Sequence, residues 1–507
     1  MKSIPLRIAA MLVAATGLAL LAPATPARDD SGGLRDKFGP NFRPATAAQA
    51  QPRRTRQHGD GSLNAVERWN QIAIDTSGLD HTPVAANEVR TFGHQLGPGR
   101  SARAMAIVHI AMFDAVNAIR GGYRGYTALP RAARETSIDS AVALAAHDTL
   151  KALYPSHAPR LEQLLAQDLA RLRPARGRGE AHAGGIELGR QAAAAILALR
   201  SGDGAAHEEP RIGTNPATDY VPLGGPGKWR QDPISKIPLA MGAHWSQVTP
   251  FVLSSAEQFR APQPPALTSP EYTNAFEEVK RLGGTGTTLR TQEQTQIGIF
   301  WAYDGTPSLC APPRLYNQIT TQIAAQQHTG EVELARLLAL VNVAMADAGI
   351  AVWESKYFYA YARPVTAFLD ADSDGNDATF TETTFVPLGA PASNLVGVNF
   401  TPPFPAYPSG HAGFGGALFQ TLRNFYGTDR IGFEFVSDEF NGTTTDNAGN
   451  PRPLMPRRFK TLSQAEEENA HSRIYLGIHW SFDAIQGVAQ GNKVADHVFR
   501  NAFTPER

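Results

Sequence analysis

The sequence of 507 residues has a single cysteine, Cys310, and no excess of either charge, with 47 basic and 47 acidic residues. One cysteine excludes an intrachain disulfide and any metal site built from several cysteines. The balanced charge and the lack of a long basic run predict no nucleic-acid partner. Alternating strand patterns are scarce, which leaves helices as the main element. The length favours two units of about 200 residues each.

Only the N-terminus has an apolar run that suggests a membrane. Lys2 and Arg7 precede an apolar run over residues 8–21, and A-P-A-T-P-A then ends at Ala27. This order is typical of a secretory signal, so we predict a signal peptide over residues 1–27 and a secreted or periplasmic protein. A membrane anchor is the alternative, and it is disfavoured because the run is shorter than the roughly 20 residues that a span needs.

The rest of the chain divides into a leader, two helical regions and a connection. Residues 28–60 are rich in Arg, Gly, Pro and Gln without an apolar period, which predicts a flexible leader. Helical periodicity runs through residues 61–201, stops in the Pro/Gly-rich residues 202–270, and resumes over residues 271–507. We therefore predict an all-α protein with two helical bundles joined by a Pro/Gly-rich connection.

An internal repeat supports this division. Residues 102–115, A-R-A-M-A-I-V-H-I-A-M-F-D-A, match residues 335–348, A-R-L-L-A-L-V-N-V-A-M-A-D-A, at eight of fourteen positions. L-Y-P-S-H-A at residues 153–158 also resembles A-Y-P-S-G-H-A at residues 406–412. Chance similarity between Ala-rich helices is the alternative to a duplicated unit, which we favour. Tyr123 stands where the repeat would place Lys356, so we expect the first bundle to be structural.

The first of three polar clusters is W-E-S-K-Y-F-Y-A-Y-A-R-P, residues 353–364. Lys356 and Arg363 are seven residues apart, which predicts that both lie on one face of a helix that Pro364 ends. Two unpaired cations on an otherwise apolar helix need an anion. A pair of surface cations whose stems lie along the helix is the alternative.

The second cluster is T-P-P-F-P-A-Y-P-S-G-H, residues 401–411, which leads into a predicted helix. Ser409 is at the expected N-cap. A helix N-terminus offers free N–H groups and a positive dipole end, and Gly410 lets an anion approach the backbone. The Ser409 hydroxyl and the Gly410 N–H are therefore candidate anion donors, with His411 beside them. A plain N-cap with a surface histidine is the alternative.

The third cluster is S-R-I-Y-L-G-I-H-W-S-F-D, residues 472–483. His479 and Asp483 are four apart and can share a helix face, which would let the carboxylate orient the imidazole. Arg473 and His479 can point to one place only if the chain turns near Gly477. Together the three clusters form a receptor for a tetrahedral oxyanion, with histidines for attack, ligation or proton transfer.

The motifs K-x6-R-P, P-S-G-H and S-R-x5-H-x3-D, in this order, resemble the signature of one superfamily. It comprises type 2 phosphatidic acid phosphatases, bacterial acid phosphatases and vanadium-dependent haloperoxidases. Phe404 before His411, Trp353 before the lysine, and W-A-Y-D-G-T-P at residues 301–307 are similar to the chloroperoxidase branch of the haloperoxidases. Two bundles also favour that branch, because the phosphatases are typically a single short bundle.

The resemblance implies a vanadate cofactor, with hydrogen peroxide and a halide ion as substrates and hypohalous acid as product. His479 is implied to bind the vanadium, which acts as a Lewis acid. The residues implied to contact the vanadate oxygens are Lys356, Arg363, Ser409, Gly410 and Arg473. His411 is implied to take a proton from peroxide, and Lys356 to polarise the bound peroxide.

Three further residues have implied roles with open alternatives. Asp304 is implied to hold Arg363 and tune His411, although a turn-forming Asp before Gly305 fits the spacing equally well. Trp353 and Phe404 are implied to wall the halide pocket, or are core aromatics.

The main alternative function is a secreted acid phosphatase, in which His479 forms a phosphohistidine and His411 protonates the leaving group. The preferred halide, a small organic acceptor and the oligomeric state are left open.

Overall fold

The computed structural model describes residues 31–44, 63–85, 88–172 and 179–506. The predicted signal peptide, residues 1–27, lies outside these ranges and stays a prediction. The N-terminal half contains α1 (Ser31–Phe38), β1 (Arg43–Pro44), α2 (Ala65–Asp80), α3 (Pro98–Arg120), α4 (Ile138–Leu153), α5 (Ala158–Arg171), α6 (Gly179–Leu199), β2 (Arg211–Ile212) and β3 (Asp219–Tyr220). The C-terminal half contains α7 (Pro270–Leu282), α8 (Gln292–Phe300), α9 (Pro312–Gln326), α10 (Glu331–Tyr359), α11 (Pro364–Asp370), β4 (Leu395–Val396), α12 (Gly410–Tyr426), β5 (Phe433–Asn441), β6 (Leu454–Phe459), α13 (Leu462–Tyr475) and α14 (Ser481–Asn501).

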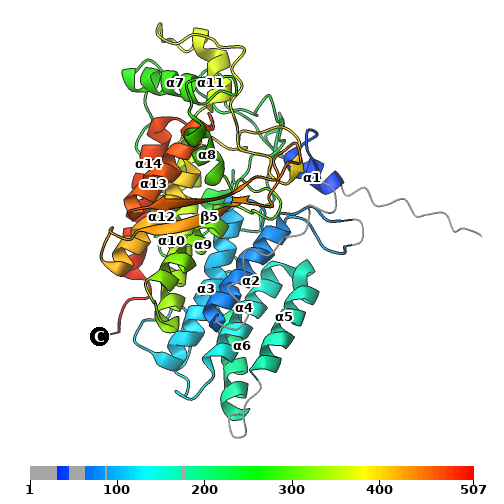
Figure 1. Ribbon diagram of the computed structural model, residues 1–507, viewed down its shortest axis with the longest axis vertical. Helices are drawn as coiled ribbons and strands as arrows, with labels where there is room; N and C mark the ends of the chain where they lie inside the picture. The colour runs from blue at the N-terminus through cyan, green and yellow to red at the C-terminus, as the bar shows by residue number, and fades with distance from the viewer. Residues whose placement is uncertain (1–30, 45–62, 86–87, 173–178, 507) are drawn as a thin grey trace, which may run out of the picture.

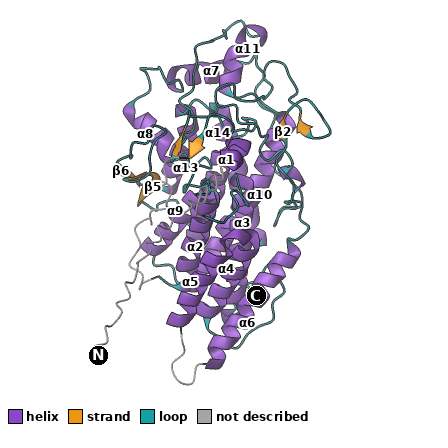
Figure 2. Ribbon diagram, turned by 90° about the vertical axis from the view of Figure 1, so that its right-hand side faces the viewer, coloured by secondary structure: helices purple, strands orange, loops and turns teal. Residues whose placement is uncertain are grey.

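The predicted all-α architecture of two bundles is confirmed. In the first bundle α4 packs against α3, α6 and α2; in the second, α12 packs against α14, α10 and α13. Figure 1 shows the first bundle in the lower half of the molecule, with α7, α8 and α11 at the opposite end, and Figure 2 shows the same division from the side. The two bundles meet where α3 packs along α10, and one hydrophobic core is continuous across both.

Contrary to the expectation that only the N-terminus has such an apolar run, the central helices α3 and α10 are also apolar and long enough to cross a membrane by length and composition alone. However, 94% of the most apolar window of α3 and 100% of that of α10 is buried inside the protein. A helix that is apolar on all sides belongs in the core of a large bundle when other helices surround it. α3 and α10 are therefore core helices that fix the two bundles to each other.

The prediction of a flexible leader over residues 28–60 is wrong for residues 31–44. Leu34, Phe38 and Phe42 are spaced four apart and are buried against the second half of the chain. β1 also pairs antiparallel with β4. A Leu and two Phe side chains at this spacing bury one apolar stripe, so this segment docks on the protein surface.

The segments outside the bundles pack around the end where the polar clusters lie. Residues 200–269, between α6 and α7, form β2, β3 and the short 3-10 helix Trp245–Gln247. Between α12 and α13, β5 and β6 form an antiparallel hairpin in which Phe433 is opposite Phe459. Within the hairpin, Ser437 Oγ donates to Phe300 O at 2.7 Å, and Asp438 N donates to Tyr303 Oη at 2.6 Å. The hairpin thus supports the chain just before Asp304.

Candidate active site

The first cationic cluster lies where α10 ends and α11 begins. α10 ends at Tyr359 because Ala360 takes the left-handed conformation, with φ 49°, and Arg363 is the N-cap of α11. The prediction that Lys356 and Arg363 share one helix face is therefore wrong. Pro364 does not end α10 but is the first residue of α11, a position that proline favours.

Both cations nevertheless bind the same stretch of backbone. Lys356 Nζ donates to the carbonyl oxygens of Pro405 and Ala406 at 2.8 and 2.9 Å. Arg363 Nε donates to the carbonyl oxygen of Phe404 at 2.9 Å. Lys356 is 0% exposed and Arg363 is 1% exposed, so neither is a surface cation. Two positive charges are therefore held side by side in the interior.

The Ser-Gly-His motif opens α12 as predicted. Ser409 is the N-cap, and its side chain accepts a hydrogen bond from Ala412 N at 3.4 Å. A Cβ at Gly410 would lie 3.0 Å from the Trp353 ring, so a larger residue would press against that tryptophan. The glycine thus keeps the helix N-terminus open and also lets the Trp353 ring pack against it.

His411 lies beside Asp304, although Asp304 does not pair with the predicted arginine. His411 Nε2 donates to Ala302 O at 2.5 Å and is 4.0 Å from Asp304 Oδ1. Asp304 Oδ1 accepts from Arg473 Nη2 at 2.7 Å, so its ion pair is with Arg473 and not with Arg363. The difference follows from the early end of α10, which directs Arg363 to the backbone of residue 404 instead.

The third motif contains the predicted turn. α13 ends at Tyr475, and Gly477 has φ 71°; a Cβ there would collide with the carbonyl of Gly283, so both conformation and space require glycine. α14 begins only at Ser481, so His479 lies in the loop before it. The prediction that His479 and Asp483 share a helix face is thus wrong in its geometry.

The predicted pairing of these two side chains does occur, and it defines the tautomer of the histidine. His479 Nδ1 is 2.8 Å from Asp483 Oδ2, and His479 Nε2 is 2.8 Å from Arg363 Nη1. Because the guanidinium can only donate, Nε2 must be the acceptor and Nδ1 must carry the hydrogen. The lone pair of Nε2 therefore faces the cationic cluster, as a metal-binding nitrogen backed by a carboxylate would.

Several buried donors of the two arginines have no partner within the described residues. Arg363 Nη2, Arg473 Nε and Arg473 Nη1 make no hydrogen bond there, although Arg473 is 0% exposed. Buried polar groups are normally satisfied, and a buried cation most of all. With Lys356, the site has three cations facing the carboxylates of Asp304 and Asp483. An anion with several acceptor oxygens, such as vanadate or phosphate, fits these donors.

The protonation equilibria show how unfavourable this cluster is without an anion. Burial, and then the neighbouring Arg363, hold the pKa of Lys356 well below its usual value. Burial and the same guanidinium lower the pKa of His479, and burial lowers the pKa of Arg363 to about 9. Burial raises the pKa of Asp483 to about 7. A bound anion would stabilise the charged form of each cation and so offset part of the desolvation.

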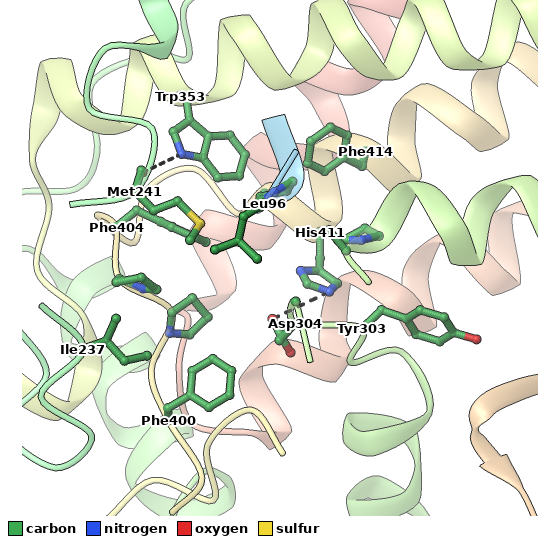
Figure 3. Close-up of a pocket in the computed structure, with 18 of the residues that line it drawn as sticks. Leu96, Ile237, Met241, Tyr303, Asp304, Trp353, Phe400, Phe404, His411 and Phe414 are labelled. Carbon is green, nitrogen blue, oxygen red and sulfur yellow. Dashed lines mark hydrogen bonds and ion pairs between the residues drawn. The ribbon is translucent and has the colours of Figure 1, made fainter. Parts of the chain in front are cut away.

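Seven of the ten predicted site residues line one apolar cavity, shown in Figure 3, whereas Lys356, Arg363 and Ser409 are not among its lining residues. Trp353 and Phe404 form an edge-to-face pair with ring centroids 4.9 Å apart. The predicted residues that line the cavity are Asp304, Trp353, Phe404, Gly410, His411, Arg473 and His479. His411 and Asp304 adjoin each other on one side of it, and Trp353 and Phe404 form part of the opposite wall.

Other residues of the wall have no sequence motif that could have identified them. Leu96 comes from the start of the first bundle, Ile237 and Met241 from the connection, and Phe400 from the loop before α12. They reach the cavity through long-range packing, which no local pattern records. None of the residues of the β5–β6 hairpin described above lines the cavity.

Comparisons with known proteins agree with this geometry. A family profile described as the VCPO second helical-bundle domain matches residues 336–505. Vanadium chloroperoxidase from Curvularia inaequalis is 30% identical over 511 residues, which cover 83% of this chain and 79% of that protein. The first bacterial vanadium-dependent iodoperoxidase of known structure superposes with a TM-score of 0.67 at 24% identity, covering 88% of this chain and 99% of that one. A holo-type bacterial vanadium-dependent chloroperoxidase gives a TM-score of 0.59 at 17% identity, covering 82% and 95%.

Proposed function

The chain belongs to the vanadium-dependent haloperoxidase family, and we propose that it oxidises a halide ion with hydrogen peroxide to hypohalous acid at a vanadate bound by His479. One observation carries the proposal. His479 Nε2 accepts from Arg363 Nη1, and the other donors of this buried cluster, Arg363 Nη2, Arg473 Nε and Arg473 Nη1, have no partner within the described residues. A nitrogen ligand opposite buried oxyanion donors is the arrangement that vanadate needs.

The roles of the anion-binding residues follow from their contacts. His479 Nε2 would hold the cofactor, and its Nδ1 bond to Asp483 would keep that nitrogen unprotonated. Residues that would neutralise or donate to its oxygens are Lys356, Arg363, Arg473, Ser409 and Gly410. When bound, vanadate supplies a Lewis-acidic centre that activates hydrogen peroxide toward attack by a halide ion.

We assign the proton transfer to His411. Its Nε2 hydrogen goes to Ala302 O, so Nδ1 carries the lone pair, and Nδ1 has no hydrogen-bond partner within the described residues. Burial, with a smaller contribution from the Arg473 charge, holds the pKa of His411 well below its usual value. The ring is therefore neutral near pH 7 and can accept a proton from hydrogen peroxide at Nδ1.

The halide would approach through the apolar part of the cavity. Lys356 Nζ lies 5.2 Å from the Phe404 ring centroid and 5.6 Å from that of Trp353. A cation between two aromatic rings gives a halide ion a favourable position next to the oxidant. The apolar walls would also admit a small organic acceptor for the oxidised halogen.

The experiment compares vanadate loading with halide oxidation. Purified protein is stripped of vanadium and assayed with hydrogen peroxide and chloride, bromide or iodide, with and without added orthovanadate. We expect oxidation only after loading, and we expect His479→Ala to lose both retained vanadium, measured by mass spectrometry, and activity. His471→Ala, on the neighbouring α13, is the matched control and should retain both. Peroxide-dependent halide oxidation at the normal rate in His479→Ala would refute the assignment.

Phosphate ester hydrolysis is the alternative use of the same donors. It predicts turnover of p-nitrophenyl phosphate by the vanadium-free protein and a phosphohistidine at His479. We propose that the loaded protein is the physiological form, and that the chain is exported with residues 1–27 removed. N-terminal sequencing of the mature protein tests the export.

A further inference from the structure

A helix outside both bundles forms part of the cavity wall. α1 contributes Lys37 and Phe38 to the same cavity that Asp304, His411 and Arg473 line. No motif of the family resemblance includes this segment. α1 therefore places a cationic side chain on the wall of the site from a part of the chain that precedes the first bundle.

Three aromatic rings fix α1 at this place. The ring centroids of Phe38 and Phe42 are 5.7 Å apart, and those of Phe38 and Phe400 are 6.3 Å apart. Phe42 and Phe400 complete the cluster at 5.8 Å. Phe400 is itself a cavity residue, so the cluster ties α1 directly to the wall. Such edge-to-face contacts give α1 a defined position.

Backbone contacts hold the segment after α1 as well. Asn41 Nδ2 donates to the carbonyl oxygen of Ile234 at 3.0 Å, within the connection. Gly39 has φ 86°, and a Cβ there would lie 2.8 Å from the carbonyl oxygen of Lys236. β1 pairs with β4 at the next residues. Residues 33–44 are thus an integral wall element, and these contacts fix the backbone of Lys37 beside the cavity.

The charge of Lys37 is not neutralised by any residue in the described part of the chain. The side chain is half-buried and makes no ion pair or hydrogen bond with any residue that the structure describes. The other charged residues of the wall are Asp304 and Arg473, which pair with each other. The remaining wall is mostly apolar, so an anion that leaves water to enter it loses hydration. The positive charge of Lys37, which has no partner among the described residues, offsets part of that loss.

We propose that Lys37 is a specificity-determining residue that attracts the halide ion into the cavity; this rests on the proposed function. The two substrates differ in charge, because a halide is an anion and hydrogen peroxide is neutral at working pH. Electrostatic attraction by Lys37 therefore lowers the KM for halide and leaves the KM for peroxide unchanged. The attraction also weakens as ionic strength rises.

The experiment uses the vanadate-loaded enzyme with iodide or bromide as substrate. Lys37→Met removes the charge and keeps the length of the side chain, and Lys37→Glu reverses the charge. Arg35→Met removes an exposed charge from the same helix, two residues away, and is the matched control. Halide KM, peroxide KM and kcat are measured at low ionic strength and again in 0.5 M sodium perchlorate.

We expect the halide KM to rise about three- to tenfold in Lys37→Met and further in Lys37→Glu, with kcat and peroxide KM unchanged. The difference should shrink in high salt, and Arg35→Met should match the wild type. An unchanged halide KM in both Lys37 variants would refute the proposal. A parallel rise in peroxide KM, or an equal shift in Arg35→Met, would also refute it. If the loaded wild type oxidises no halide, it is the proposed function that fails.

Discussion

Helices α3 and α10 carry the same fourteen-residue pattern, and their shared polar residues make equivalent contacts. Asp114 of α3 accepts hydrogen bonds from the backbone of residues 126–127 at 2.8 and 2.7 Å. At the corresponding position of α10, Asp347 accepts from the backbone of residues 251–253 at 2.6, 2.8 and 3.0 Å. In both bundles a buried aspartate thus anchors an irregular segment to the central helix.

A second pair of positions repeats the correspondence. His109 Nε2 of α3 is 2.9 Å from Asn70 Oδ1 of α2, and Asn342 of α10 exchanges hydrogen bonds of 2.8 Å with Asn317 of α9. Each contact joins the central helix of a bundle to the helix that precedes it. Equivalent contacts at equivalent positions favour duplication over chance similarity of Ala-rich helices.

The two helices differ where they end. Arg120, the last residue of α3, corresponds to Trp353, and Gly121 then takes φ 72°. In α10 the next positions are Glu354 and Ser355, which continue the helix to Tyr359. The longer α10 carries Lys356 to the anion-binding site, whereas Tyr123 follows the end of α3 in a loop and donates to Glu333 at 2.7 Å. A pair of glycines in one copy therefore separates the structural bundle from the catalytic one.

The largest effect should come from removing the residue that distinguishes α10. Lys356→Met keeps most of the length of the side chain but removes one of the three buried cations that the oxyanion needs, which costs about 3–5 kcal/mol. We expect orthovanadate affinity to fall at least about 100-fold, measured by titration of the vanadium-free protein.

Tyr123→Phe is the matched change in the first bundle. It removes the hydrogen bond to Glu333 and should cost about 1 kcal/mol of stability with no change in vanadate affinity. Weaker vanadate binding in Tyr123→Phe would show that the first bundle also acts on the site. Normal binding in Lys356→Met would show that the extension of α10 has no part in holding the anion.

The next largest effect is on stability in acid. Burial lowers the pKa of His109 to about 4, whereas an unfolded histidine titrates near 6.5. Below pH 6.5 the unfolded chain takes up a proton that the folded state does not, so stability falls as pH falls. His109→Asn introduces the residue found at the equivalent position of α10 and removes this pH-dependent loss of stability. Between pH 7.5 and pH 5, the free energy of unfolding should therefore fall by about 2 kcal/mol less in the variant than in the wild type.

Urea unfolding of the vanadium-free proteins at the two pH values measures this difference. His411 and His479, whose pKa values are also lowered, are present in both proteins and cancel in the comparison. Each protein is compared with itself at pH 7.5, so any pH-independent loss of stability from altered packing in the variant cancels. If the gap between the two proteins is the same at pH 7.5 and pH 5, His109 is not neutral in the folded state.

Local chemistry made much of the site predictable from the sequence. The N-cap at Ser409 and the turn at Gly477 depend on residues within one turn of chain, and both occur as predicted. The pairing of His479 with Asp483 was also predicted, although their shared helix was not formed. The repeat identified α3 and α10 as equivalent.

What the sequence could not predict depends on distant contacts. Ala360 in the left-handed conformation ends α10 early, and alanine gives no local signal for it. Asp304 forms its ion pair with Arg473 because of the positions in space at which α10 and α13 end. The docking of residues 31–44 gives only a weak sequence signal, because the stripe of Leu34, Phe38 and Phe42 is short and apolar only at every fourth residue.

The smallest effect should arise where the first bundle contacts the catalytic loop. Ser308 lies in the loop that carries Asp304, and its N–H donates to Thr82 Oγ1, just after α2, at 2.9 Å. Ser308 has φ 69° and Tyr303 has φ 44°, so this loop holds a conformation that needs outside support. Thr82→Val removes the nearer of two acceptors and leaves Gly78 O at 3.3 Å, and we expect a kcat/KM for peroxide about fivefold lower, corresponding to roughly 1 kcal/mol.

Thr76→Val separates support of the loop from general stability. Thr76 is also buried in α2, but its hydroxyl donates to Ile72 O within the helix at 2.7 Å. It should lower the melting temperature as much as Thr82→Val and leave kcat/KM unchanged. If kcat/KM for peroxide is the same in the two variants, the first bundle contributes only to the stability of the protein and not to the position of the catalytic loop. A loss confined to Thr82→Val would mean that the structural copy helps to position Asp304, because its α2 end supplies a hydrogen bond that the second bundle does not.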